Sequence, residues 1–74
     1  MKTEMLEMIL ELEHDEQVDV TTTDTKIFLT FSRSFKAEGH WKNLIKRIED
    51  ATGMKPTGIN TVFYFVTLIY KNEE

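Results

Sequence analysis

The stretch that decides the fold is TVFYFVTLIYK, residues 61–71. Almost all of its residues are β-branched, aromatic or aliphatic, which is typical of a β-strand. Alternation along a strand separates its side chains into two sets, Val62, Tyr64, Val66, Leu68 and Tyr70 on one face, and Thr61, Phe63, Phe65, Thr67 and Ile69 on the other. Both faces are apolar, unlike those of a strand with one face in water. We expect one continuous strand here, with one face packed under helices.

Two shorter alternating segments precede this strand and predict a β-hairpin. Val18 and Val20 alternate with polar residues in 17–22, and Ile27, Leu29 and Phe31 alternate with other residues in 25–33. A two-residue turn at Thr23-Asp24 would pair Val20 with Ile27 and Val18 with Leu29. All of these aliphatic side chains then share one face, whereas a loop one residue longer would separate them. The pattern therefore favours a loop with an even number of residues.

Two segments have the periodicity of amphipathic helices. Residues 3–14 place Met5, Met8, Ile9 and Leu12 on one face, widened by Leu6, with Thr3 as the expected N-cap. Residues 35–52 place Trp41, Leu44, Ile45 and Ile48 on one face, with Ser34 as the expected N-cap, although Gly39 permits a later start. Gly53 and Pro56 predict the end of the second helix. We expect residues 53–60 to form a loop.

The order of these segments predicts the architecture. Because a helix connects the second and third strands, a right-handed crossover would make those strands parallel. The expected fold is a two-layer α+β domain of order αββαβ, with a three-stranded mixed sheet and two helices on one face. With 74 residues the chain is expected to be a single domain, residues 1–74. A domain of this size buries only about 60% of its unfolded surface, so its stability margin is expected to be small.

Composition excludes several kinds of site. The chain has no cysteine, which rules out disulfides and cysteine-bound zinc and is compatible with a reducing compartment, the cytoplasm. Glutamates interrupt the N-terminal segment, so no signal peptide is expected, and the longest uncharged apolar run, residues 59–70, is shorter than the roughly 20 residues of a membrane-spanning helix. His14 and His40 lie on different elements, and residues 53–58, GMKPTG, lack the ending of a phosphate loop. We expect no enzyme, no cofactor and no metal site.

Charge is unevenly distributed along the chain. Residues 1–24 contain one basic and eight acidic residues, and residues 25–60 contain seven basic and three acidic ones. The acidic segment could face a basic partner, such as a nucleic-acid-binding protein that it inhibits, through Glu4, Glu7, Glu11 and Asp15. The alternative is a nucleic-acid-binding face on the second helix, formed by Lys36, Lys42, Lys46 and Arg47. The net charge of −4 disfavours this alternative.

The second face of the last strand has no predicted cover, because both helices are needed on the first. Exposed apolar patches on small domains commonly mark interfaces. We therefore expect an interface formed by Phe28, Phe63, Phe65 and Ile69. The sequence predicts a small non-enzymatic binding or regulatory protein that acts through protein–protein contacts, is a homodimer, and is of the kind common among bacterial and phage proteins.

Overall fold

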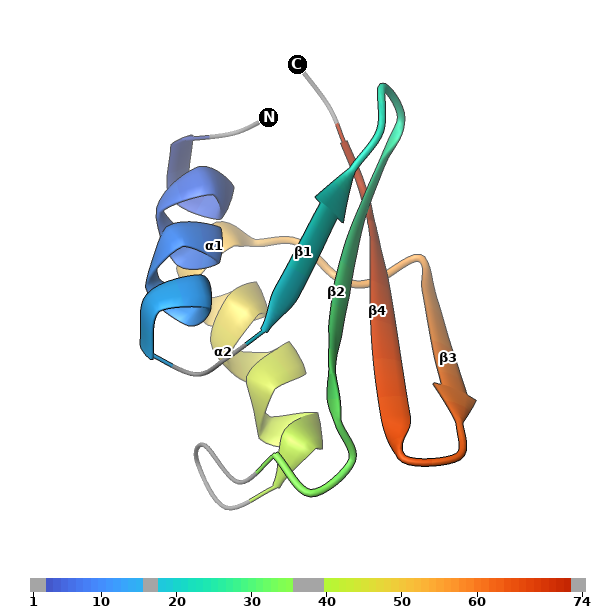
Figure 1. Ribbon diagram of the computed structural model, residues 1–74. Helices are drawn as coiled ribbons and strands as arrows, with labels where there is room; N and C mark the ends of the chain where they lie inside the picture. The colour runs from blue at the N-terminus through green and yellow to red at the C-terminus, as the bar shows by residue number, and fades with distance from the viewer. Residues whose placement is uncertain (1–2, 16–17, 36–39, 73–74) are drawn as a thin grey trace.

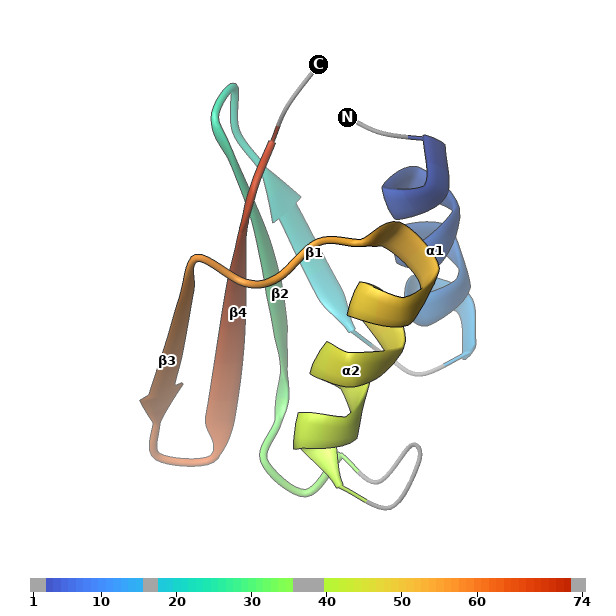
Figure 2. The ribbon, with the colours of Figure 1, turned by 180° about the vertical axis from the view of Figure 1, so that it is seen from behind.

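The computed structural model describes residues 3–15, 18–35 and 40–72 (Figure 1). Its elements follow one another as α1 (Thr3–Asp15), β1 (Asp19–Thr22), β2 (Lys26–Ser32), α2 (Trp41–Thr52), β3 (Gly58–Val62) and β4 (Phe65–Lys71). Both helices cover the same face of the sheet, as the two opposite views show (Figures 1 and 2). The expected α+β class with two helices on one face is confirmed.

The sheet differs from the prediction in strand number and direction. It has four strands in the order β1-β2-β4-β3, and every neighbouring pair is antiparallel. The three-stranded mixed sheet is wrong because the chain reverses at Phe63-Tyr64, inside the segment expected to be one strand, and because β3 begins within the expected loop. β3 does run in the same direction as β2, but β4 lies between them and pairs with both.

The β1–β2 hairpin keeps the predicted face but not the predicted pairing. Val20 lies opposite Leu29 and Thr22 opposite Ile27, so the register is shifted by two residues. The turn is Asp24-Thr25, closed by a hydrogen bond of 2.8 Å from the Thr23 N–H to the Lys26 carbonyl. The loop remains even, and a shift of two residues preserves the side on which each side chain lies.

The helices bury the faces that their periodicity indicates. Met5, Met8, Ile9 and Leu12 of α1 are buried, whereas Leu6, expected to widen that face, is 46% exposed.

The end of α2 is as predicted, since Gly53 has a left-handed backbone (φ 74°) and its N–H donates to the Glu49 carbonyl at 2.7 Å.

α2 starts after Gly39, which is the later of the two starts that the sequence permits. The helix begins at Trp41, and the His40 Nδ1 atom accepts a hydrogen bond of 3.1 Å from the Lys42 N–H. Ser34, the expected cap, instead hydrogen-bonds to Ser32. Residues 36–39 of the expected helix lie outside the described residues.

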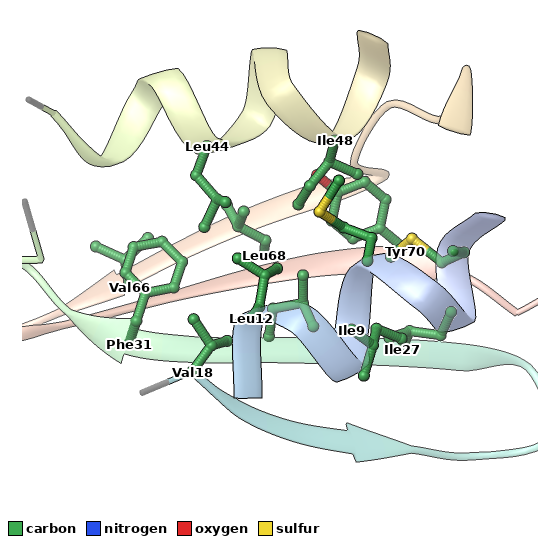
Figure 3. Close-up of a cluster of buried hydrophobic side chains, with 13 residues drawn as sticks. Ile9, Leu12, Val18, Ile27, Phe31, Leu44, Ile48, Val66, Leu68 and Tyr70 are labelled. Atoms are coloured by element: carbon green, nitrogen blue, oxygen red, sulfur yellow. The ribbon is translucent and has the colours of Figure 1, made fainter. Parts of the chain in front are cut away.

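The core lies between the helices and the sheet (Figure 3). Among the described residues, thirteen buried hydrophobic side chains form it, Met5, Met8, Ile9, Leu12, Val18, Ile27, Leu29, Phe31, Leu44, Ile48, Val66, Leu68 and Tyr70. Tyr70 is fully buried, and its hydroxyl has no hydrogen-bond partner in the described part of the chain. Burial raises the pKa of this hydroxyl well above its ordinary value, and the nearby charge of Glu49 adds to the shift.

Candidate interaction surface

The β3–β4 turn carries the two most exposed large hydrophobic side chains of the described residues, Phe63 and Tyr64. Val62, Phe63, Tyr64 and Phe65, named here the hairpin tip, are 50%, 84%, 77% and 57% exposed. Val62 pairs with Phe65, so Phe63 and Tyr64 are the two central residues of the turn. The Arg33 N–H donates to the Tyr64 carbonyl, which joins the tip to the end of β2.

Phe63 has an unusual backbone conformation. Its φ is 51°, and it is the one residue other than glycine with positive φ among the described residues. Two-residue hairpin turns need positive φ at the first central position, where glycine or asparagine is favoured. For a bulky residue this conformation is strained, because the Cβ atom approaches the following carbonyl group. A large apolar ring thus occupies a position that is unfavourable for it in both backbone geometry and exposure.

The face of the sheet opposite the helices, named here the open face, adjoins the hairpin tip. Across it, Phe28 lies opposite Ile69, Thr30 opposite Thr67, and Ser32 opposite Phe65. The Thr30 and Thr67 hydroxyl oxygens are 3.1 Å apart and hydrogen-bonded. Of the four residues expected to form an interface, Phe28, Phe65 and Ile69 share this face, whereas Phe63 lies at the turn.

Val62, Tyr64 and Ile59 do not lie where the sequence pattern predicts. Val62 and Tyr64 were expected on the covered face, but the turn places Val62 beside Phe65 on the open face and exposes Tyr64. Ile59, expected in a loop, lies on the helix side of β3, opposite Leu68. It is nevertheless 49% exposed, because β3 is the sheet edge farthest from α1 and the helices do not cover it (Figure 2).

The acidic residues that were expected to meet a basic partner lie on α1. Glu4, Glu7 and Glu11 are exposed there, and Asp15 is the last residue of the helix, with a side chain outside the described set. Glu11 forms an ion pair with Arg47 of α2. The acidic face is therefore in contact with the predicted basic face.

The expected nucleic-acid face is not uniformly basic. Lys42 is exposed and its ammonium lies 5.8 Å from the centre of the Trp41 ring, while Lys36 lies outside the described residues. Lys46 and Arg47 line a shallow hollow of about 560 Å³ beside α2, together with Asn43, Asp50 and Ala51. Because Asp50 lines this hollow and Glu11 neutralises Arg47, attraction for a phosphate backbone is reduced.

The described residues contain no group of three or more histidine, aspartate or glutamate side chains that could hold a metal ion. No helix in the described ranges is long and apolar enough to cross a membrane. Comparison of the chain with protein-family models, with curated proteins and with solved structures found no match.

Proposed function

We propose that this protein is a small non-enzymatic binding or regulatory protein whose hairpin tip and adjoining open face contact another protein. The observation that carries the proposal is the placement of Phe63 and Tyr64, which are 84% and 77% exposed at the centre of a tight turn. A turn at this position needs no aromatic residue for its own stability.

The size of the apolar surface supports a binding role. An aromatic side chain has about 150–250 Å² of surface, so the exposed fractions of Phe63, Tyr64 and Phe65 amount to about 300–550 Å². This value is in the range of the largest apolar patch of an ordinary monomer, which is often functional. Here the patch belongs to a molecule with a total accessible surface of only 4944 Å². Val62 and the half-buried Phe28 and Ile69 extend it along the open face.

Backbone strain at Phe63 supports the same role. Unfavourable φ values persist where the surrounding structure enforces them, and they are concentrated at functional sites. A hairpin holds its tip residues rigidly, so an aromatic anchor there loses little conformational freedom on binding. Tyrosine is among the side chains most enriched at the energetic centres of protein interfaces, and phenylalanine is enriched in their buried cores. We propose that the protein acts in the cytoplasm, in keeping with its lack of cysteine.

A test is partner capture with matched baits. The variant Phe63→Gly/Tyr64→Asn replaces both rings by residues that favour a two-residue turn, so the fold should be retained or stabilised. The control bait is Lys42→Glu/Lys46→Glu, which reverses charge on α2 and leaves the hairpin tip intact. We expect the wild type and the control to retain the same protein after nuclease treatment, and the turn variant to lose it.

Two outcomes would contradict the proposal. Capture of the same protein by all three baits would show that the hairpin tip is not the binding surface. Recovery of nucleic acid alone, lost with the Lys42→Glu/Lys46→Glu bait, would favour the nucleic-acid-binding alternative.

A further inference from the structure

The two edges of the sheet differ in how well they are protected. β1 forms one edge, begins with Asp19 and packs beside α1 (Figure 1). β3 forms the other edge, and its five residues, GINTV, include no charged residue and no proline. Charged residues, proline and covering elements are the usual devices that prevent edge strands from pairing with other chains. Of the two edges, β3 is the one that lacks them.

The pairing pattern shows which groups of β3 face outward. The Tyr64 carbonyl accepts from Arg33 on the β2 side, so the alternating pattern directs the backbone groups of Phe65 towards β3. Val62 pairs with Phe65, and the N–H and C=O groups of Val62 and Asn60 are therefore directed to β4. Those of Ile59 and Thr61 are directed away from the sheet.

We propose that β3 pairs with β3 of a second copy of this chain, antiparallel and about a two-fold axis at Asn60, so that the two sheets become one. This inference rests on the proposed function and deepens it, because it names the partner of the β3–β4 hairpin. In this register Ile59 of each copy lies opposite Thr61 of the other. The outward donors and acceptors of both residues then find partners.

The residues of β3 are compatible with their own copies. An interface about a two-fold axis places Asn60 opposite Asn60, and an amide side chain can both donate to and accept from an identical group. The half-exposed Ile59, which neither helix covers, would lie beside the partner's Thr61, both β-branched. Continuing the register places Phe63 and Tyr64 of each copy beside residues 56–57 of the other copy, just before β3 begins.

Charge distribution selects this edge for self-association. α1 carries the exposed Glu4, Glu7, Glu11 and Glu13 and lies beside the opposite edge of the sheet (Figure 1). Pairing through β3 keeps the two acidic helices at the far ends of the dimer, whereas pairing through β1 would bring Asp19 and α1 of the two copies together. Like charges at an interface oppose association.

The contact is small, so the dimer should dissociate reversibly on dilution. A strand of this length spans only about 17–20 Å, and interfaces below about 1200 Å² are typically transient. Sedimentation equilibrium of the full chain, from about 1 to 500 μM, should therefore show a mass rising from 8.7 kDa towards twice that value.

A matched pair of proline variants tests the edge. Thr61→Pro removes an outward N–H of β3, and Thr22→Pro removes one of β1, since the Thr23–Lys26 pair directs the Thr22 N–H outward. We expect the Thr61→Pro variant to be monomeric throughout this concentration range and the Thr22→Pro variant to associate like the wild type. Circular dichroism verifies that each variant is folded.

A charge-swap pair tests the same register without proline. Thr61→Lys and Thr61→Glu place like charges about 7–8 Å apart across the axis, and each variant alone should associate about 2- to 30-fold more weakly than the wild type. Mixing the two variants should restore the dimer.

Three results would overturn the inference. They are a wild-type monomer at about 500 μM, a Thr61→Pro dimer as stable as the wild type, and a mixture of the charged variants that stays monomeric. A dimer that persists with Thr61→Pro but dissociates with Phe65→Lys would place the contact on the open face instead. In that case the proposed function stands without the β3 dimer. It also stands without this dimer if the wild type is monomeric but the turn variant still loses its captured partner.

Discussion

Replacing Tyr70 by phenylalanine should stabilise the protein, although the residue is fully buried. The Tyr70 side chain packs in the core with Ile48 and its neighbours (Figure 3), and its hydroxyl has no hydrogen-bond partner among the described residues. A buried hydroxyl without a partner destabilises the folded state by about 1–3 kcal/mol. Tyr70→Phe removes this cost and keeps the ring.

The free-energy cost of the void that the substitution leaves is small. Deleting one oxygen leaves a void of about 15 Å³ at most, which at about 24 cal/mol per Å³ costs about 0.4 kcal/mol. We therefore expect the free energy of unfolding to rise by about 0.6–2.6 kcal/mol at neutral pH. In a domain of this size each kcal/mol corresponds to about 4–8 °C in Tm.

The pH dependence gives an independent check. Because the folded pKa of Tyr70 is raised, this group contributes stability that is fully present below the unfolded pKa of about 10 and is lost as pH rises towards the folded value. Above about pH 10 the wild type should lose about 1.4 kcal/mol per pH unit relative to Tyr70→Phe.

Urea denaturation of both proteins at neutral and alkaline pH measures these differences, with Tyr64→Phe as the control. Tyr64 is 77% exposed, so its hydroxyl is hydrated and its removal should change stability by less than about 0.5 kcal/mol. A decrease of about 1 kcal/mol or more in the free energy of unfolding of Tyr70→Phe would show that the hydroxyl makes a hydrogen bond in the folded protein and would contradict this prediction.

Three further predictions concern the core, the end of α2 and the surface of α2. Leu44→Ala should destabilise by about 2–5 kcal/mol because Leu44 is 1% exposed, whereas Leu10→Ala, at a site 57% exposed, should have little effect; thermal melts that shift Leu44→Ala by only a degree or two would contradict the core assignment. Gly53→Ala should lower the free energy of unfolding by about 1–2 kcal/mol, measured in urea, because φ is 74° while no atom obstructs a Cβ; an unchanged Cm would be evidence against the left-handed cap. Reversing Lys42 and Lys46 to glutamate should leave partner capture unchanged, and tight, salt-dependent binding of nucleic acid that this variant loses would show that the alternative function is correct.

The parts of the fold that were predictable from sequence are those with a clear hydrophobic periodicity or with residues that end a helix. Met5, Met8, Ile9 and Leu12 repeat at helical spacing, and the helix buries all of them. Gly53 followed by Pro56 combines a left-handed cap with a residue that cannot continue a helix. In both cases the sequence pattern is local, so tertiary contacts did not alter the secondary structure that it predicts.

The β3–β4 turn was missed because its residues give no turn signal. Tight turns are recognised by glycine, proline, asparagine or aspartate, and Phe63-Tyr64 contains none of them. The preceding Gly58 and Asn60 are common in loops, and they concealed β3. One usable signal was length, since an uninterrupted eleven-residue strand is about twice the ordinary length of five to six residues.

For α2 the sequence permits two starts, one at Phe35 and a later one after Gly39, and the structure has the later one. Serine is a favoured N-cap, so Ser34 appeared the better choice on residue type alone, yet the side chain that caps the helix belongs to His40. The two hydroxyl groups of Ser32 and Ser34 bond to each other at 2.9 Å. Ser34 therefore bonds within its own turn, a local alternative to capping that residue preferences alone do not describe.

Phe63 and Tyr70 each have a feature that destabilises the fold, but we expect only the one at Phe63 to be related to function. Both residues destabilise the folded state, Phe63 through its positive φ and Tyr70 through its unpaired hydroxyl. Phe63 lies in the turn before β4 and Tyr70 lies near the other end of this strand, so the effects of Phe63→Gly and Tyr70→Phe on stability should add. Marginal stability is common in small domains and would by itself explain either defect. Only the defect at the hairpin tip coincides with an exposed apolar surface, and therefore relief of strain at Phe63 should weaken partner binding while relief at Tyr70 leaves it intact. If both substitutions stabilised the protein and neither affected binding, Phe63 would be an incidental defect as well, and the strongest support for the proposed function would be lost.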